Sequence, residues 1–118
     1  KKEFVRRVVV FEDQFREFRK SLDRETLKKL YQVITLIMMV EKVPVRFLKA
    51  IEGRKGLYEI RVENYTNIYR VFCCFDKGNL VILFNGFQKK TQKTPSSQLD
   101  KAEALMKKYF EQKQQANE

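Results

Sequence analysis

Apolar residues in the first third of the chain recur with two different periods, which predict a strand followed by two helices. Residues 7–11 (RVVVF) are short and rich in β-branched side chains, a composition that favours a β-strand. Residues 12–20 follow with phenylalanines at helical spacing and acidic residues at their start, typical of an amphipathic helix. From Thr26 the apolar positions keep the helical period to about residue 41 or 42, and Ser21 or Asp23 can cap this second helix.

The second half of the chain alternates apolar runs with turn-forming residues, which predicts an antiparallel meander and a last helix. The expected strands are residues 57–63, 68–75 and 80–84. Residues 43–56 contain one proline and two glycines and predict a loop with one turn of helix near residues 46–48. Ser96 or Ser97 can cap a final helix that runs to about Lys113. This order predicts an α+β fold, which at this length forms a single domain over residues 1–118.

The strand expected at residues 80–84 is apolar on both faces. This pattern is typical of a central strand covered by helices on one side and by another body, such as a partner, on the other. Residues 85–95 (NGFQKKTQKTP) follow it with three lysines and no acidic residue. Although Asn-Gly is a hairpin signal, the strand alternation stops there, so we interpret Gly86 as a bend out of the sheet. Fixed positive charge at such an edge predicts a phosphate-bearing partner.

The formal charge of +10 is unevenly distributed. Residues 42–61 contain six basic and two acidic side chains, and residues 79–95 contain three basic and no acidic ones, so these two segments hold +7 of the total. A generally basic, solvated surface without a specific ligand is the alternative interpretation.

Cysteine and histidine content limits the chemistry. Cys73 and Cys74 are adjacent in an apolar strand, where they point to opposite faces and do not easily bridge, so we expect reduced thiols; a vicinal redox pair is the alternative. With no other cysteine and no histidine, a zinc site or disulfide framework has no ligands, and a reducing cytoplasm is the expected location. No apolar run approaches the roughly 20 residues that span a bilayer, so we expect no membrane partner.

Strand alternation places charged residues on one face of the segment 57–63. Glu59, Arg61 and Glu63 share that face, and a hairpin through residues 64–67 puts Arg61 directly opposite Arg70. Two facing arginines repel each other, which favours an anion between or near them. The acidic neighbours on the same strand provide an alternative source of neutralisation. Lysines of the segment 85–95 can reach the same face if the strand 80–84 pairs with the strand that carries Arg70, although a solvated charge run is the usual explanation for them.

Three motifs carry a resemblance to a known family. Residues 57–61 (LYEIR), 69–72 (YRVF) and 86–95 (GFQKKTQKTP), in this order and spacing, resemble the phage-derived, HigB-like branch of the RelE/ParE toxin superfamily. The resemblance extends from the first helix to the last, and the fold expected for that superfamily agrees with the predicted order of elements. It implies the toxin of a type II toxin–antitoxin pair, a cytoplasmic ribonuclease that cuts messenger RNA, commonly on the ribosome.

The implied reaction is attack of a ribose 2′-hydroxyl on the adjacent phosphate, which needs a base, an acid and cations but no metal or other cofactor. Arg61 and Arg70 match cationic positions of the family and are the expected phosphate contacts; Glu59, or a lysine with a lowered pKa, is the candidate base. Lys89 or Lys90 is the candidate acid or phosphate clamp. The further expected RNA contacts are Lys49, Arg54, Lys55, Gln92, Lys93 and Thr94.

One departure from the family concerns acid–base chemistry. Many relatives have histidine before the Gly-Phe pair, where this chain has Asn85. The resemblance then implies slower chemistry, or chemistry that depends on lysine and ribosomal RNA groups, with a degraded or repurposed toxin as the alternative. A ParE-like action on DNA gyrase and a non-catalytic RNA-binding module remain as alternatives. The implied partners are messenger RNA, the ribosome and a HigA-like antitoxin with a helix-turn-helix domain, through which alone the toxin would meet operator DNA. An acidic, amphipathic antitoxin segment suits the cationic surface and the apolar strand.

Overall fold

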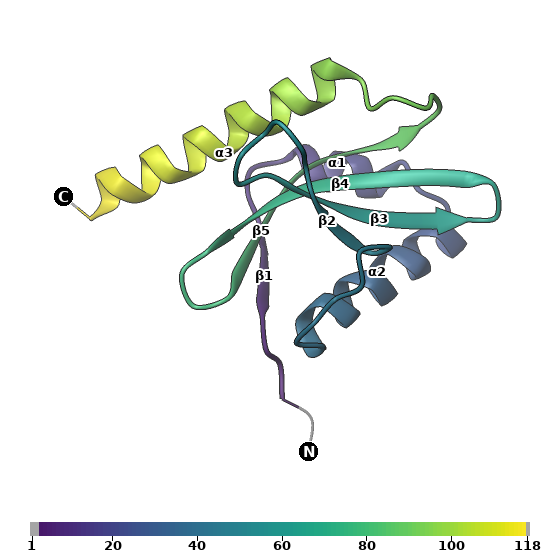
Figure 1. Cartoon of the computed structure of the whole chain (residues 1–118), viewed down its shortest axis with the longest axis horizontal. Helices are drawn as coiled ribbons and strands as arrows, with labels where there is room; N and C mark the ends of the chain where they lie inside the picture. The colour runs from purple at the N-terminus through teal and green to yellow at the C-terminus, as the bar shows by residue number, and fades with distance from the viewer. Residues whose placement is uncertain (1–2, 118) are drawn as a thin grey trace.

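The computed structural model describes residues 3–117, in which three helices surround one five-stranded sheet (Figure 1). The strands are β1 (Arg7–Val10), β2 (Leu48–Ala50), β3 (Tyr58–Asn64), β4 (Asn67–Asp76) and β5 (Leu80–Lys89). The helices are α1 (Gln14–Lys20), α2 (Arg24–Met39) and α3 (Ser96–Ala116). The sheet order is β1-β5-β4-β3-β2, with β1 parallel to β5 and the other neighbours antiparallel. The predicted α+β fold with an antiparallel meander is confirmed.

The sheet separates two hydrophobic cores, because alternate residues of each strand point to opposite faces. Helices α1 and α2 cover one face and α3 covers part of the other (Figure 1). Cys73 and Cys74 are both buried and unbridged, one in each core, as the alternation predicts. Ala102 and Leu105 of α3 pack with Ile82 on the face that the sequence left to a partner. The second cover of residues 80–84 is therefore α3.

Helix boundaries follow local backbone chemistry. The Asp23 carboxylate accepts a hydrogen bond of 2.7 Å from the Thr26 backbone N–H, so Asp23 is the cap of α2. Helix α1 begins two residues later than predicted, because Glu12 adopts a left-handed φ of 61°. The predicted serine cap of α3 is wrong: Pro95 occupies the capping position with φ −59°, and no side chain caps this helix. No helix within residues 3–117 is long and apolar enough to cross a membrane.

The expected turn of helix at residues 46–48 is replaced by a hydrogen-bonded turn and an unpredicted edge strand. The Phe47 N–H donates to the Pro44 carbonyl at 2.9 Å, and β2 then pairs with the start of β3. A strand of three residues is too short to show an alternating pattern in the sequence. Strand β2 forms because it pairs with β3.

Strand β5 continues five residues beyond its predicted end, and the prediction of a bend at Gly86 is wrong. Gly86 lies opposite Val71 within the sheet. A Cβ atom at Gly86 would lie 2.4 Å from Cδ2 of Phe18 on α1. Glycine is therefore needed here for close packing of α1 on the sheet.

Candidate nucleic-acid interface

Strand pairing brings the predicted arginines together on the sheet face that α3 partly covers. Arg61 lies directly opposite Arg70, as the hairpin register predicted. Arg70 in turn lies opposite Phe87, which packs in the core under α3. Because directly paired residues point to the same side of a sheet, both arginines face the α3 side.

The Glu59 carboxylate supplies a counter-charge to both arginines. Its Oε2 atom lies 3.3 Å from Nε of Arg61 and 3.6 Å from Nε of Arg70. The exposed fractions of the three side chains are 13% for Glu59, 29% for Arg61 and 4% for Arg70. The arrangement is thus one carboxylate and two guanidiniums with net charge +1, in which the predicted neutralisation by a neighbouring acid is present.

Arg70 is the most constrained member of this cluster. Its Nη1 atom donates a hydrogen bond of 3.1 Å to the Tyr69 carbonyl, while Nε has no hydrogen-bond partner. Burial lowers the pKa of Arg70, and the charge of Glu59 opposes that shift. A guanidinium remains protonated at any physiological pH, so Arg70 presents a fixed positive charge.

Two predicted lysines flank the arginines on the same face. Lys49 of β2 lies opposite Glu59, and Lys89 of β5 lies opposite Ile68, two residues before Arg70. Lys49 is exposed, Lys89 is half-buried, and a cavity of about 370 Å³ is lined by Lys49, Glu59 and residues 50–52. Cations from β2, β3, β4 and β5 therefore share one face of the sheet, with Lys49 beside Glu59 and Lys89 beyond Arg70.

The other predicted contacts of the basic block lie in the connection between β5 and α3. Lys90, Gln92 and Lys93 are exposed, and Thr94 is half-buried. The Thr91 hydroxyl donates to the Lys93 carbonyl at 2.7 Å, which folds this connection back on itself. Within residues 3–117, the lysines of this connection have no carboxylate within 4.0 Å.

Arg54 and Lys55 are not brought to the arginine pair. The Arg54 guanidinium bonds to Asp100 at 2.9 Å and to Glu103, both on α3, and these acids raise its pKa. Lys55 lies beside a groove lined by α3 residues that include Met106. Both cations therefore contact the outer cover of the sheet, and Arg54 anchors α3.

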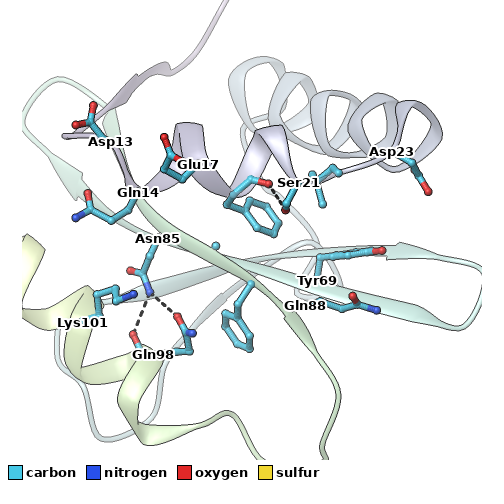
Figure 2. Close-up of a pocket in the computed structure, with 14 residues that line it drawn as sticks. Asp13, Gln14, Glu17, Ser21, Asp23, Tyr69, Asn85, Gln88, Gln98 and Lys101 are labelled. Carbon is cyan, nitrogen blue, oxygen red and sulfur yellow. Dashed lines mark hydrogen bonds between the residues drawn. The ribbon is translucent and has the colours of Figure 1, made fainter.

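Asn85 is a buried link between β5 and α3. The Asn85 Nδ2 atom donates hydrogen bonds to the Gln98 backbone carbonyl at 3.2 Å and to the Gln98 Oε1 atom at 3.0 Å, which Figure 2 draws as dashed lines. The adjoining cavity of about 650 Å³ is lined by three carboxylates and one lysine. None of the predicted site residues lines it, and its acidic rim would repel phosphate.

Two further cations near Arg61 were not found from the sequence. Lys29 of α2 and Arg46 of the turn before β2 line a cavity of about 200 Å³ together with Arg61. Lys29 lies in the predicted second helix, whose packing on β3 could not be predicted from the sequence, and without β2 nothing located Arg46 beside β3.

Comparison with known proteins identifies a family and agrees with the fold. The family described as "Phage derived protein Gp49-like (DUF891)" matches residues 15–107. A chain of the archaeal RelE–RelB complex from Pyrococcus horikoshii OT3 has the same fold, with a TM-score of 0.54 and 19% identity over 76% of this chain and 99% of that chain. No curated protein matches the sequence significantly. The chain therefore belongs to the phage-derived Gp49-like family and has the fold of the RelE/ParE superfamily, as the sequence motifs predicted.

Proposed function

We propose that this protein is the toxin of a type II toxin–antitoxin pair and a metal-independent endoribonuclease that cleaves messenger RNA, commonly on the ribosome in the cytoplasm. The observation that carries the proposal is the cluster of Glu59, Arg61 and Arg70 on a sheet face flanked by Lys49 and Lys89, neither of which has a carboxylate within 4.0 Å among residues 3–117. The fixed positive charges of Arg61 and Arg70 suit a phosphate that gains negative charge during the reaction.

The scissile phosphate binds the two arginines and thereby competes with Glu59 for them. The Glu59 carboxylate, released from the arginines, then lies beside the bound nucleotide. Glu59 then takes the proton of the 2′-hydroxyl as the 2′-oxygen attacks phosphorus. The bond to the 5′-oxygen breaks, Lys89 or Lys90 protonates that oxygen, and a 2′,3′-cyclic phosphate remains.

The partner of this toxin is an acidic, amphipathic antitoxin, of the HigA-like type with a helix-turn-helix domain that alone contacts operator DNA. The likeness to a chain of a RelE–RelB complex supports an antitoxin partner. The unpaired lysines beyond β5 supply the charge that an acidic segment needs.

Induction of the protein in cells, followed by mapping of transcript 5′ ends, tests the proposed activity. We expect new ends within coding sequences, which disappear for Arg61→Ala and for the double variant Lys89→Ala/Lys90→Ala. Lys107→Ala removes one positive charge from an exposed position on α3; it serves as the control for Arg61→Ala and keeps full activity. DNA damage without new ends would support gyrase poisoning, and neither effect would support a non-catalytic RNA-binding module.

Experiments with purified protein then distinguish cleavage of free RNA from cleavage that requires the ribosome. Cleavage of naked RNA and of ribosome-bound RNA is compared at equal protein concentration, with the Arg70→Lys variant as the probe of bidentate phosphate binding. Loss of cleavage in a variant that unfolds like wild type supports a catalytic role. Full toxicity of Arg61→Ala and of the lysine pair would refute the site.

A further inference from the structure

We infer that Lys29 and Arg46 form a second phosphate site beside Arg61, which holds the RNA backbone at a phosphate other than the scissile one. The inference rests on the proposed ribonuclease function and extends it by a subsite that sets how the strand crosses the sheet. Its ligand is a phosphodiester of the bound RNA strand.

Three separate elements position the residues of this site. Lys29 comes from α2, Arg46 from the turn that precedes β2, and Arg61 from β3. The Arg61 backbone N–H donates to the Phe47 carbonyl at 2.8 Å, which fixes the turn against β3 where β2 has not yet begun. The turn is closed by bonds from Phe47 and from Leu48 to the Pro44 carbonyl, at 2.9 and 3.2 Å.

Arg46 is oriented by its own neighbour. Its guanidinium carbon lies 4.8 Å from the centroid of the Phe47 ring, a cation–π distance that restrains an otherwise mobile side chain. The same ring packs against the core under α1 and α2. Arg46 is thus held at the cavity by a residue anchored in the core, which lowers the entropy cost of binding a ligand.

The charge of the cavity is suited to an anion. Within residues 3–117, neither Lys29 nor Arg46 has a carboxylate within 4.0 Å, so both cations are free to bind one. Glu63 is the acidic residue among those that line the cavity, and it is exposed to solvent. The space of about 200 Å³ accommodates a phosphate group, and the Gln32 amide adds a further polar group to its lining.

Arg61 connects this cavity with the proposed reaction centre. Arg61 lines the cavity, and its Nε atom pairs with Glu59 on the sheet face. A strand whose scissile phosphate lies at Arg61 and Arg70 can therefore pass over the edge of β3 and place a flanking phosphate between α2 and the turn. A solvated lysine alone would not account for a cavity lined from three elements or for an arginine stacked on a core-anchored ring.

The test uses fluorescently labelled 2′-O-methyl RNA, which lacks the attacking hydroxyl, in a series from two to ten nucleotides extended at either end. For wild type, anisotropy should show one length at which affinity rises about tenfold, as the second phosphate is reached. The Lys29→Ala/Arg46→Ala variant should lose this step and lower the salt slope by about 0.7, the value for one phosphate contact on a single strand, while short RNAs bind unchanged. A step that persists in the variant would overturn the inference.

Lys101→Ala/Lys107→Ala is the matched control, because it removes the same charge from exposed residues of α3 that do not line this cavity. Equal weakening by both double variants, at all lengths, would show general electrostatics and overturn the inference. Inorganic phosphate is titrated in parallel: saturation by phosphate with no length step for RNA would also overturn it. A step that Lys29 and Arg46 control, in a protein that cleaves no RNA, would support the inference and refute only the proposed function.

Discussion

Glu59→Gln separates two roles of the carboxylate that lies between the arginines. Glutamine keeps the size of the side chain and removes its charge. The Oε2 atom that is replaced lies 3.3 Å from Arg61 and 3.6 Å from Arg70, and Glu59 is only 13% exposed. A general base and a structural counter-charge predict different results for this one substitution.

The effect on stability follows from the charges that remain. Breaking a buried ion pair on one side costs about 3–5 kcal/mol, because an uncompensated charge stays behind. Arg61 is 29% exposed and partly screened by solvent, so we expect a loss of about 2–4 kcal/mol in the free energy of unfolding. Adding Arg61→Gln should recover at least about 1 kcal/mol, since the repulsion between the paired arginines is then removed.

Urea unfolding measures the stability terms, and single-turnover cleavage of RNA measures the chemistry. If Glu59 is the base, the cleavage rate of Glu59→Gln falls by about 10²–10⁴, while non-cleavable RNA binds at least as tightly because the site gains net positive charge. If Glu59 is only a counter-charge, cleavage persists. A variant with wild-type rate would refute the base assignment, and one with unchanged stability would refute the ion-pair reasoning.

Three further predictions concern the scaffold. Gly86→Ala should lower the free energy of unfolding, measured in urea, by about 1–3 kcal/mol, because its Cβ would lie 2.4 Å from the Phe18 ring. In a Phe18→Leu background the same substitution should cost almost nothing. Equal costs in both backgrounds would contradict this packing. The Asp76 carboxyl accepts hydrogen bonds from the Lys113 ammonium at 2.7 and 2.8 Å, and its pKa is lowered from 3.8 to about 2. The ionised carboxylate therefore stabilises the fold above pH 3.8, and this contribution is lost as the pH falls toward 2. Lys113→Ala should flatten this acid dependence, and an unchanged profile of stability against pH would refute the assignment. Burial raises the pKa of Cys73 and of the cysteine beside it, so a thiol reagent at pH 8 should react only as fast as the protein unfolds, whereas rapid labelling of native protein would contradict this.

Features fixed by short-range chemistry could be predicted from the sequence. The turn between β3 and β4 sets the register of its hairpin, so Arg61 could be placed opposite Arg70 without coordinates. Asp23 could be proposed as a helix cap because capping depends on the amides of the next turn.

Features fixed by distant partners could not be predicted. Strand β2 exists through its pairing with β3, and the true role of Gly86 depends on Phe18, which lies far away in sequence. Arg54 counted as one of many cations in a basic segment until α3 supplied two acids to it. The missing information in each case was the identity of a contact, which periodicity does not carry.

The same distinction decides which part of the +10 charge is available to RNA. Arg54 lies against two carboxylates of α3, so its charge is already compensated, whereas Arg46 and Lys49 come from the same basic segment and have no carboxylate within 4.0 Å among residues 3–117. Lys101 and Lys107 of α3 also have no carboxylate within 4.0 Å among these residues, so the absence of an ion pair alone does not locate the site. Lys49 and Lys89 differ from them because they share the sheet face of the arginine pair. Since a polyanion gains most from charges that have no competing partner, uncompensated charge on that shared face localises RNA more sharply than the net charge does.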